Sequence, residues 1–157
     1  MKSLVVYYSR TGNAKFVAQT VAAELGSDLE EIVDTKNRAG KLGWISASRD
    51  ASGGKQTSIS PMTRNPADYD LIIVGTPVWA WRPTPAIRTY FANNNLTGKK
   101  IALFFTMDSN PRQAAEKTKA LAPGAVCVGE LAIAKALDNK VEAEKKIADW
   151  CSTLKNA

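Results

Sequence analysis

Residues 4–13 of the chain read LVVYYSRTGN, a short apolar run followed at once by small polar residues. The run from Leu4 to Tyr8 is too short for a buried helix and is rich in β-branched and aromatic side chains, which favours a buried central strand. Beyond the polar residues, apolar side chains recur at three- and four-residue steps up to Gly26, as in an amphipathic helix that ends at a glycine. We therefore predict a strand, a tight loop and a helix whose core face carries Ala14, Val17, Ala18, Val21, Ala22 and Leu25.

Four further strands are predicted along the chain, at Leu29–Val33, Leu71–Gly75, Ile101–Phe105 and Ala125–Ile133. The second and third of these consist of consecutive apolar residues, as expected of parallel strands covered on both faces. The first contains Glu30 and Glu31, and we place it at an edge of the sheet because it is too polar for the middle.

Helices are predicted between these strands, and their alternation with the strands indicates an α/β fold with a parallel sheet covered on both faces. They are expected around Ala86–Phe91, over Arg112–Ala122, and after a cap at Asp138. The last helix is expected to turn Val141, Ile147, Ala148, Cys151 and Leu154 toward the core.

Residues 36–70 are predicted to form a long surface connection, because they contain four glycines and two prolines among many Ser, Thr and Lys residues. At most one short helix, around Leu42–Ser48, is expected there. A chain of 157 residues with 45% hydrophobic residues suits one domain, which we place over residues 1–157.

Composition disfavours several classes of function. With no histidine and only Cys127 and Cys151, a zinc site or a cysteine protease is not expected. The net charge of +6 comes from scattered basic residues, so we do not expect nucleic-acid binding. No apolar run approaches the roughly 20 residues that span a bilayer, and no apolar leader precedes the first strand, so we expect a cytoplasmic protein without membrane insertion.

In open parallel sheets, ligands bind beyond the carboxyl ends of the strands, where the strand order reverses. The loop after the first strand enters a helix directly, and the free amides and dipole of a helix start favour an anion. Its hydroxyl and amide side chains can donate hydrogen bonds, its glycine allows close backbone approach, and its arginine adds charge. A phosphate monoester would suit this loop, although a helix cap by Thr11 is the alternative. The candidate residues are Ser9, Arg10, Thr11, Gly12, Asn13 and Ala14.

The loop has one glycine and no following GKS or GKT, so it is neither a dinucleotide fingerprint nor a nucleotide-triphosphate loop. Here the chain resembles the flavodoxin family, whose FMN-phosphate loop has the pattern Ser/Thr-x-Thr-Gly-x-Thr. Ala14 replaces the last threonine and leaves only its backbone amide. The resemblance implies FMN as the cofactor and a flavodoxin-like, doubly wound, five-stranded parallel sheet in the order 2-1-3-4-5.

The loop after the third strand, GTPVWAWRP at residues 75–83, carries two tryptophans between two prolines. A flavin ring could stack on an indole, which would bury apolar area and exclude water. The resemblance implies that Thr76 lies at the ribityl chain or ring edge and that Trp79 or Trp81 stacks on the flavin. The alternative is that both tryptophans close the core, as we expect of Trp44 and Trp150. The remaining candidates in this loop are Pro77, Val78 and Ala80.

The loop after the fourth strand lies where this family packs against the flavin, but it lacks the aromatic residue often found there. We expect Met107 to provide an apolar cover. Alternatively, Asp108, Ser109 and Asn110 cap the next helix, with Pro111 in its first turn. The candidate cofactor residues in this loop are Thr106, Met107, Asp108 and Ser109.

The resemblance implies an electron carrier that moves electrons between redox partner proteins, a reductase and an acceptor, as a monomer or weak dimer. Such a protein contributes no catalytic side chain and no metal, because the flavin carries the chemistry. The alternatives are an FMN-dependent NAD(P)H or quinone reductase of the same fold and a flavin-free interaction domain. Arg82 is the cation that we expect to raise the flavin potential.

Overall fold

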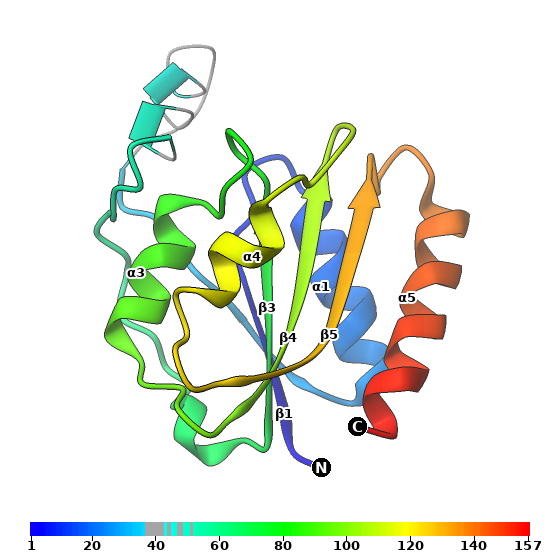
Figure 1. The fold of residues 1–157 in the computed structure, drawn as a ribbon. Helices are drawn as coiled ribbons and strands as arrows, with labels where there is room; N and C mark the ends of the chain where they lie inside the picture. The colour runs from blue at the N-terminus through cyan, green and yellow to red at the C-terminus, as the bar shows by residue number, and fades with distance from the viewer. Residues whose placement is uncertain (37–42, 44, 47–48, 51) are drawn as a thin grey trace.

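A computed structural model describes residues 1–36, 43, 45–46, 49–50 and 52–157 (Figure 1). Its five strands form one parallel sheet in the order β2-β1-β3-β4-β5, which confirms the expected order. The strands are β1 (Ser3–Tyr7), β2 (Asp28–Glu31), β3 (Leu71–Pro77), β4 (Lys100–Met107) and β5 (Val126–Ala134). As predicted, the polar strand β2 lies at an edge.

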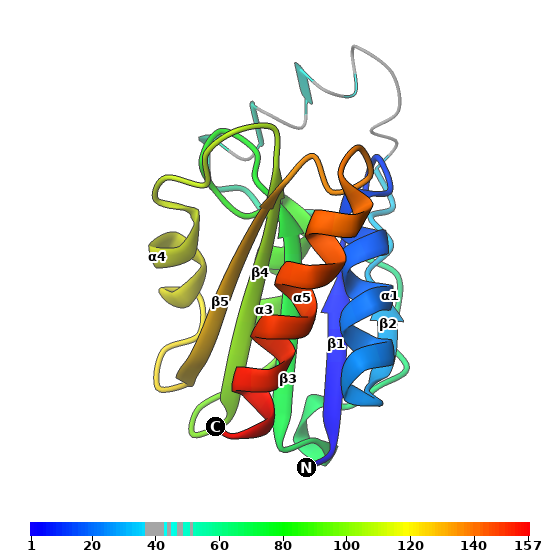
Figure 2. The same ribbon diagram turned by 90° about the vertical axis from the view of Figure 1, so that its right-hand side faces the viewer.

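Helices cover both faces of the sheet, which Figure 2 shows nearly on edge. Helices α1 (Asn13–Leu25) and α5 (Lys140–Lys155) pack on one face, while α3 (Pro85–Asn93) and the short α4 (Ala114–Lys119) pack on the other. A 3-10 turn, η1 (Pro66–Asp68), precedes β3. The fold is therefore a doubly wound α/β sandwich, and the carboxyl ends of all five strands point to one end of it.

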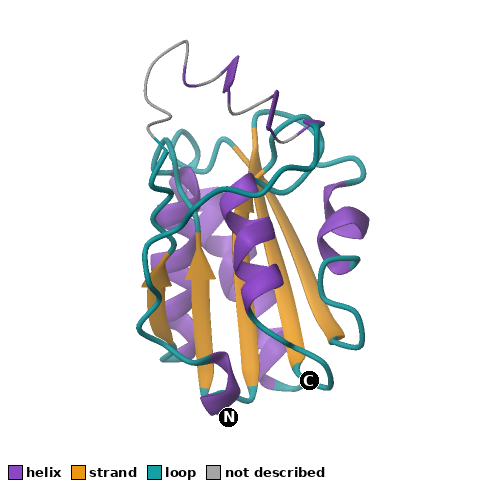
Figure 3. Ribbon diagram, turned by 90° about the vertical axis from the view of Figure 1, so that its left-hand side faces the viewer, coloured by secondary structure: helices purple, strands orange, loops and turns teal. Residues whose placement is uncertain are grey.

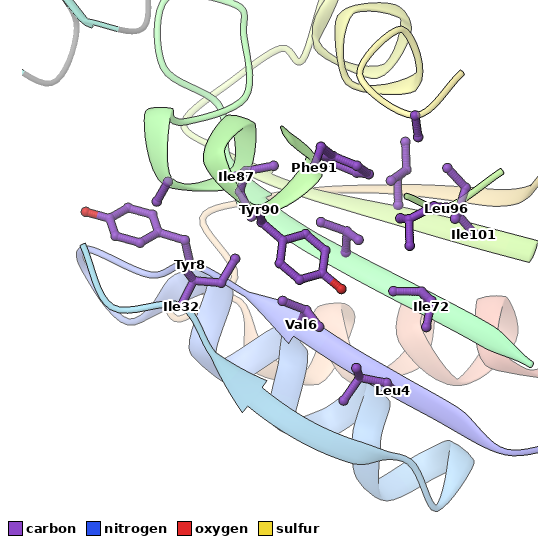
Figure 4. Close-up of a cluster of buried hydrophobic side chains, with 14 of the residues drawn as sticks. Leu4, Val6, Tyr8, Ile32, Ile72, Ile87, Tyr90, Phe91, Leu96 and Ile101 are labelled. Carbon is purple, nitrogen blue, oxygen red and sulfur yellow. The ribbon is translucent and has the colours of Figure 1, made fainter. Parts of the chain in front are cut away.

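The two cores follow from the alternation of side chains along each strand. In β1, Leu4 and Val6 point toward α3, whereas Val5 and Tyr7 point toward α1 and α5. Figure 4 shows the first of these cores, with the fully buried ring of Tyr90 lying over β1 and β3. Continuous apolar strands such as β1 therefore supply both faces of the sheet at once.

The long connection from β2 to β3 returns along α3 (Figure 3). The backbone N–H of Thr57 donates to Thr89 Oγ1 at 3.0 Å, and that hydroxyl donates to the Thr57 carbonyl at 2.6 Å. The described part of the connection is thus bonded to a helix of the main fold. Most of the helix predicted at 42–48 lies outside the described residues, and Trp44 lies outside them as well.

Two predicted helices differ from expectation. Helix α5 begins at Lys140 after Asn139, with no side-chain cap, so the predicted cap at Asp138 is wrong. Val141 is 82% exposed, because it lies in the first turn, before the helix reaches the sheet. Helix α4 is shorter than predicted, since Arg112 has a φ of 44° that interrupts helical geometry. Trp150 is buried, as expected.

Candidate functional site

The loops after β1, β3 and β4 meet at the carboxyl edge of the sheet and enclose a cleft of about 130 Å³. The strand order reverses between β1 and β3, which is where ligands of such sheets bind. Every residue that lines the cleft belongs to the predicted candidate set: Arg10, Thr11, Asn13, Pro77, Val78, Trp79, Thr106, Met107 and Asp108. The three predicted loops therefore line one cleft.

The first loop leaves the start of α1 open to a ligand. Gly12 occupies the N-cap position with a φ of 94°, and no side chain caps the helix. The alternative role of Thr11 as the cap is therefore wrong. Ser9 Oγ instead accepts a 3.1 Å hydrogen bond from the Gly12 N–H and shapes the turn. The amides of the first helical turn are thus placed to bind an anion.

The side chain of Asn13 joins this loop to the loop after β5. Its Nδ2 donates to Thr11 Oγ1 at 3.2 Å, while its Oδ1 accepts from the Leu137 backbone N–H at 3.0 Å. Leu137 also lies over the loop, since its Cδ1 would be 3.4 Å from a β-carbon at Gly12. Leu137 was not predicted as part of the site, because a leucine in a polar loop carries no signal of such a contact.

The tryptophan loop makes a tight turn that separates its two indoles. Trp79 and Arg82 exchange two backbone hydrogen bonds of 3.0 Å, with Ala80 and Trp81 between them at φ values of 48° and 59°. Trp79 is 9% exposed and meets the Tyr8 ring edge-on at 5.6 Å. Trp81 is 51% exposed and lies outside the cleft. Trp79 is therefore both a core residue and a wall of the cleft.

Thr76 holds the ends of this loop together. The residue is fully buried, and its hydroxyl donates to the Pro77 carbonyl at 2.8 Å and accepts from the Thr84 N–H at 3.2 Å. Its predicted contact with the ribityl chain or the ring edge stays a prediction.

The third loop is bonded to the second by the Val78 N–H, which donates to the Thr106 carbonyl at 2.9 Å. No side chain caps α4, whose N-cap is Gln113, so capping of this helix by Asp108, Ser109 or Asn110 is wrong. Asn110 Oδ1 instead accepts from the Arg112 N–H at 2.7 Å. The Arg112 guanidinium lies 4.4 Å from the centre of the Trp81 ring, which connects the tips of the two loops.

Backbone strain is concentrated at this edge. Within the described residues, the non-glycine residues with positive φ are Ala80, Trp81, Arg112 and Lys135, and all four follow the carboxyl end of a strand. Each such residue costs roughly 1 kcal/mol or more, and such strain commonly accumulates where a ligand is bound. The strain agrees with the cleft in marking this edge as functional.

Comparison with known proteins agrees with this geometry. The sequence model of the flavodoxin family matches residues 2–154. The chain belongs to the flavodoxin family. No protein with a curated function matches it by sequence.

Several solved structures of flavoproteins and flavodoxins share the fold of this flavodoxin-family chain. It is similar to the flavoprotein of Lactobacillus acidophilus NCFM, crystallised in complex with FMN, with 25% identity, a TM-score of 0.72, and coverage of 87% of this chain and 96% of that one. It also resembles oxidised flavodoxin 2 from Bacillus cereus, with 20% identity, a TM-score of 0.63 and 99% coverage of both chains. A flavodoxin from Streptococcus pneumoniae TIGR4 gives 17% identity, a TM-score of 0.63 and the same coverage.

The charges at the edge of the flavodoxin fold favour an anionic ligand. The loops after β1, β3, β4 and β5 contain four cations, Arg10, Arg82, Arg112 and Lys135, against two acids, Asp108 and Asp138. Arg82 does not line the cleft, so its predicted effect on a flavin would act from outside the cleft lining.

Two kinds of feature are absent from the described part of this flavodoxin-family chain. It contains no group of three or more His, Cys, Asp and Glu side chains arranged to hold a metal ion. Nor does any helix there combine the length and apolar character needed to cross a membrane.

Proposed function

We propose that the protein binds one molecule of FMN non-covalently and carries electrons between redox partner proteins. The observation that carries the proposal is the cleft itself, in which an uncapped helix start and a buried tryptophan face the same space. An FMN molecule requires both, because it has a phosphate at one end and a flat aromatic ring at the other. The FMN complex of the Lactobacillus acidophilus protein supports the same cofactor.

The residues of the cleft fit the two ends of FMN. Arg10, Thr11 and Asn13 would hold the phosphate, together with the first-turn amides of α1. The apolar side chains of Val78, Trp79 and Met107 would cover the ring. The cleft is smaller than the roughly 300 Å³ of a typical ligand pocket, so we expect part of the ring to lie at its open mouth. An exposed ring edge is what electron transfer to a partner protein requires.

The flavin would supply the redox chemistry, and the protein sets its potential through apolar cover and nearby charge. Trp79 and Met107 would exclude water from the ring, which would strengthen the electrostatic interactions beside it. Arg82, from outside the cleft lining, would favour the negative charge of the reduced ring and should raise the potential. An FMN redox titration that shows no lower potential for Arg82→Gln would contradict the role of Arg82.

Flavin titration of the apoprotein tests the site. We expect flavin fluorescence to be quenched on binding. Trp79→Leu should weaken FMN binding by about 3- to 10-fold, because it removes the free energy of one aromatic pair. Trp81→Leu is the matched control, because Trp81 lies outside the cleft, and it should change affinity little. Equal losses in the two variants would contradict the assignment of Trp79. If micromolar FMN showed no quenching of its fluorescence, the proposal would be contradicted.

Turnover distinguishes a carrier from a reductase. The carrier should oxidise NADH and NADPH only when a separate reductase is present, since the family resemblance supplies no nicotinamide site. Steady oxidation of either nucleotide by the pure, FMN-loaded protein with a quinone acceptor would instead establish the reductase alternative.

A further inference from the structure

Two arginines outside the cleft converge on one open position. Arg82 follows the tryptophan turn, and Arg88 lies on α3. A β-carbon built on Gly54 would be 3.8 Å from Arg82 Nη1 and 3.6 Å from Arg88 Nη1. Both guanidinium groups therefore border the same point, which glycine leaves without a side chain.

Neither of these two charges is paired with a carboxylate. No ion pair joins Arg82 or Arg88 to a described acidic residue, and the residues outside the described part include neither Asp nor Glu. Arg88 is half-buried, and its Nε is a buried donor without a hydrogen-bond partner. Buried donors and charges in native proteins are normally satisfied, so this pair requires an explanation.

The two arginines also destabilise each other. Burial and the nearby charge of Arg82 together lower the pKa of the Arg88 guanidinium. Two like charges beside a desolvated donor cost free energy unless an anion lies between them. A phosphate dianion can accept hydrogen bonds from two guanidinium groups at once, and it balances two positive charges.

We propose that Arg82 and Arg88, on either side of Gly54, bind the phosphate group of a small-molecule ligand at a site separate from the cleft. Neither arginine lines the cleft, so the site does not depend on FMN. Arg82 is nevertheless bonded to Trp79, a wall of the cleft, through two backbone hydrogen bonds. A ligand held there would lie beside the loop that we propose covers the flavin.

Calorimetric titration of the FMN-loaded protein with inorganic phosphate, and separately with adenosine monophosphate, tests this site. Arg88→Gln should weaken binding about tenfold or more, since it removes one charge-assisted partner. Lys145→Gln is the matched control, because it removes the same charge from an exposed position on α5, on the opposite face of the sheet. Tighter binding of the nucleotide would identify it as the source of the phosphate, and tighter binding of the free ion would identify inorganic phosphate. Equal affinities in wild type and both variants would overturn the proposal, whether or not the protein binds FMN.

A second pair of variants compares a carboxylate with a neutral amide at position 54 of the chain itself. Gly54 has a φ of 64°, which Asp and Asn tolerate better than other side chains. Gly54→Asp should supply a carboxylate between the guanidinium groups, abolish phosphate binding and raise the thermal midpoint above that of Gly54→Asn. Equal thermal midpoints for these two variants would show that the position is not surrounded by uncompensated positive charge, and would overturn the proposal.

Discussion

Asn13 Oδ1 accepts a 3.0 Å hydrogen bond from the backbone N–H of Leu137, 124 residues further along the chain. This bond connects the loop after β1 to the loop after β5, so one end of the cleft is braced from a loop that contributes nothing to its lining. The same amide group donates to Thr11 Oγ1 at 3.2 Å. A loop held from both sides loses less conformational freedom when a ligand binds, which favours affinity.

The first prediction separates the brace from the charge at Asn13. Asn13→Asp keeps an acceptor for Leu137 but places a negative charge beside the proposed phosphate site, whereas Asn13→Ala removes the hydrogen bonds of the side chain without adding charge. We expect Asn13→Asp to weaken FMN binding by about 100-fold and Asn13→Ala by about 10-fold. Apoprotein carrying Asp should be at least as stable as the Ala variant, because an acid at a helix start is favourable. Fluorimetric titration measures the FMN affinity, and thermal unfolding measures the stability of the apoprotein. An Ala variant that binds FMN more weakly than the Asp variant would contradict the prediction.

The second prediction concerns the close packing of Gly75 against Phe104. A β-carbon at Gly75 would lie 1.9 Å from Phe104 Cζ, and that ring is fully buried. Gly75→Ala should therefore lower the free energy of unfolding by about 3 kcal/mol. Gly26→Ala is the control, because Gly26 has a φ of 63° but no neighbour within 4 Å, and strain alone should cost about 1 kcal/mol.

A double variant identifies the cause of the loss at Gly75. Phe104→Leu in the Gly75→Ala background should recover part of the stability, since the smaller side chain leaves room for the methyl group. Urea unfolding measures the stability of the wild type, of the single variants Gly75→Ala and Phe104→Leu, and of the double variant. If the two substitutions were simply additive, the clash would not be the cause.

Much of the fold was predictable because parallel strands buried on both faces need continuous apolar residues. The runs at 4–8, 71–75 and 101–105 are apolar on consecutive residues, and this continuity identified β1, β3 and β4. The prediction that Val141 faces the core was wrong for a related reason. It fits the helical spacing of α5, yet spacing cannot show that the first turn of the helix extends past the sheet.

The site was predictable as a set of loops but not as a geometry. Strand ends and helix starts locate the loops, and every residue of the cleft lining lies within them. The choice between Trp79 and Trp81 depends on a turn in which Ala80 and Trp81 adopt left-handed conformations, and neither residue type favours that conformation. The contact of Asn13 with Leu137 spans most of the chain and leaves no local pattern.

The third prediction concerns stability at alkaline pH. Burial raises the pKa of the Cys151 thiol from its ordinary 9.0 to about 11. Between these values the unfolded thiol loses its proton while the native thiol keeps it, so the unfolded state binds fewer protons and stability falls as pH rises. The loss should reach about 1 kcal/mol by pH 10.

Cys151→Ala tests this origin. The variant should be less stable than wild type at pH 7, because it leaves a cavity, but its stability should fall less between pH 9 and pH 10. Burial also raises the pKa values of Tyr7 and Tyr90, and these groups act in both proteins. Only the difference between the two slopes therefore reports on the thiol, and parallel slopes would contradict the prediction.

The fourth prediction concerns the strained turn that separates the two indoles. Ala80 has a φ of 48°, where alanine is disfavoured and asparagine is tolerated. Ala80→Asn should raise the free energy of unfolding by about 0.5 to 1 kcal/mol, whereas Ala120→Asn, at a φ of −62° on the exposed end of α4, has no such strain to relieve. FMN affinity should be unchanged in both variants, because the turn geometry that leaves Trp79 in the cleft is kept. A gain in stability accompanied by weaker FMN binding would mean that the strain itself helps to hold Trp79 against the ligand, and that relieving it lets the turn relax away from the cleft.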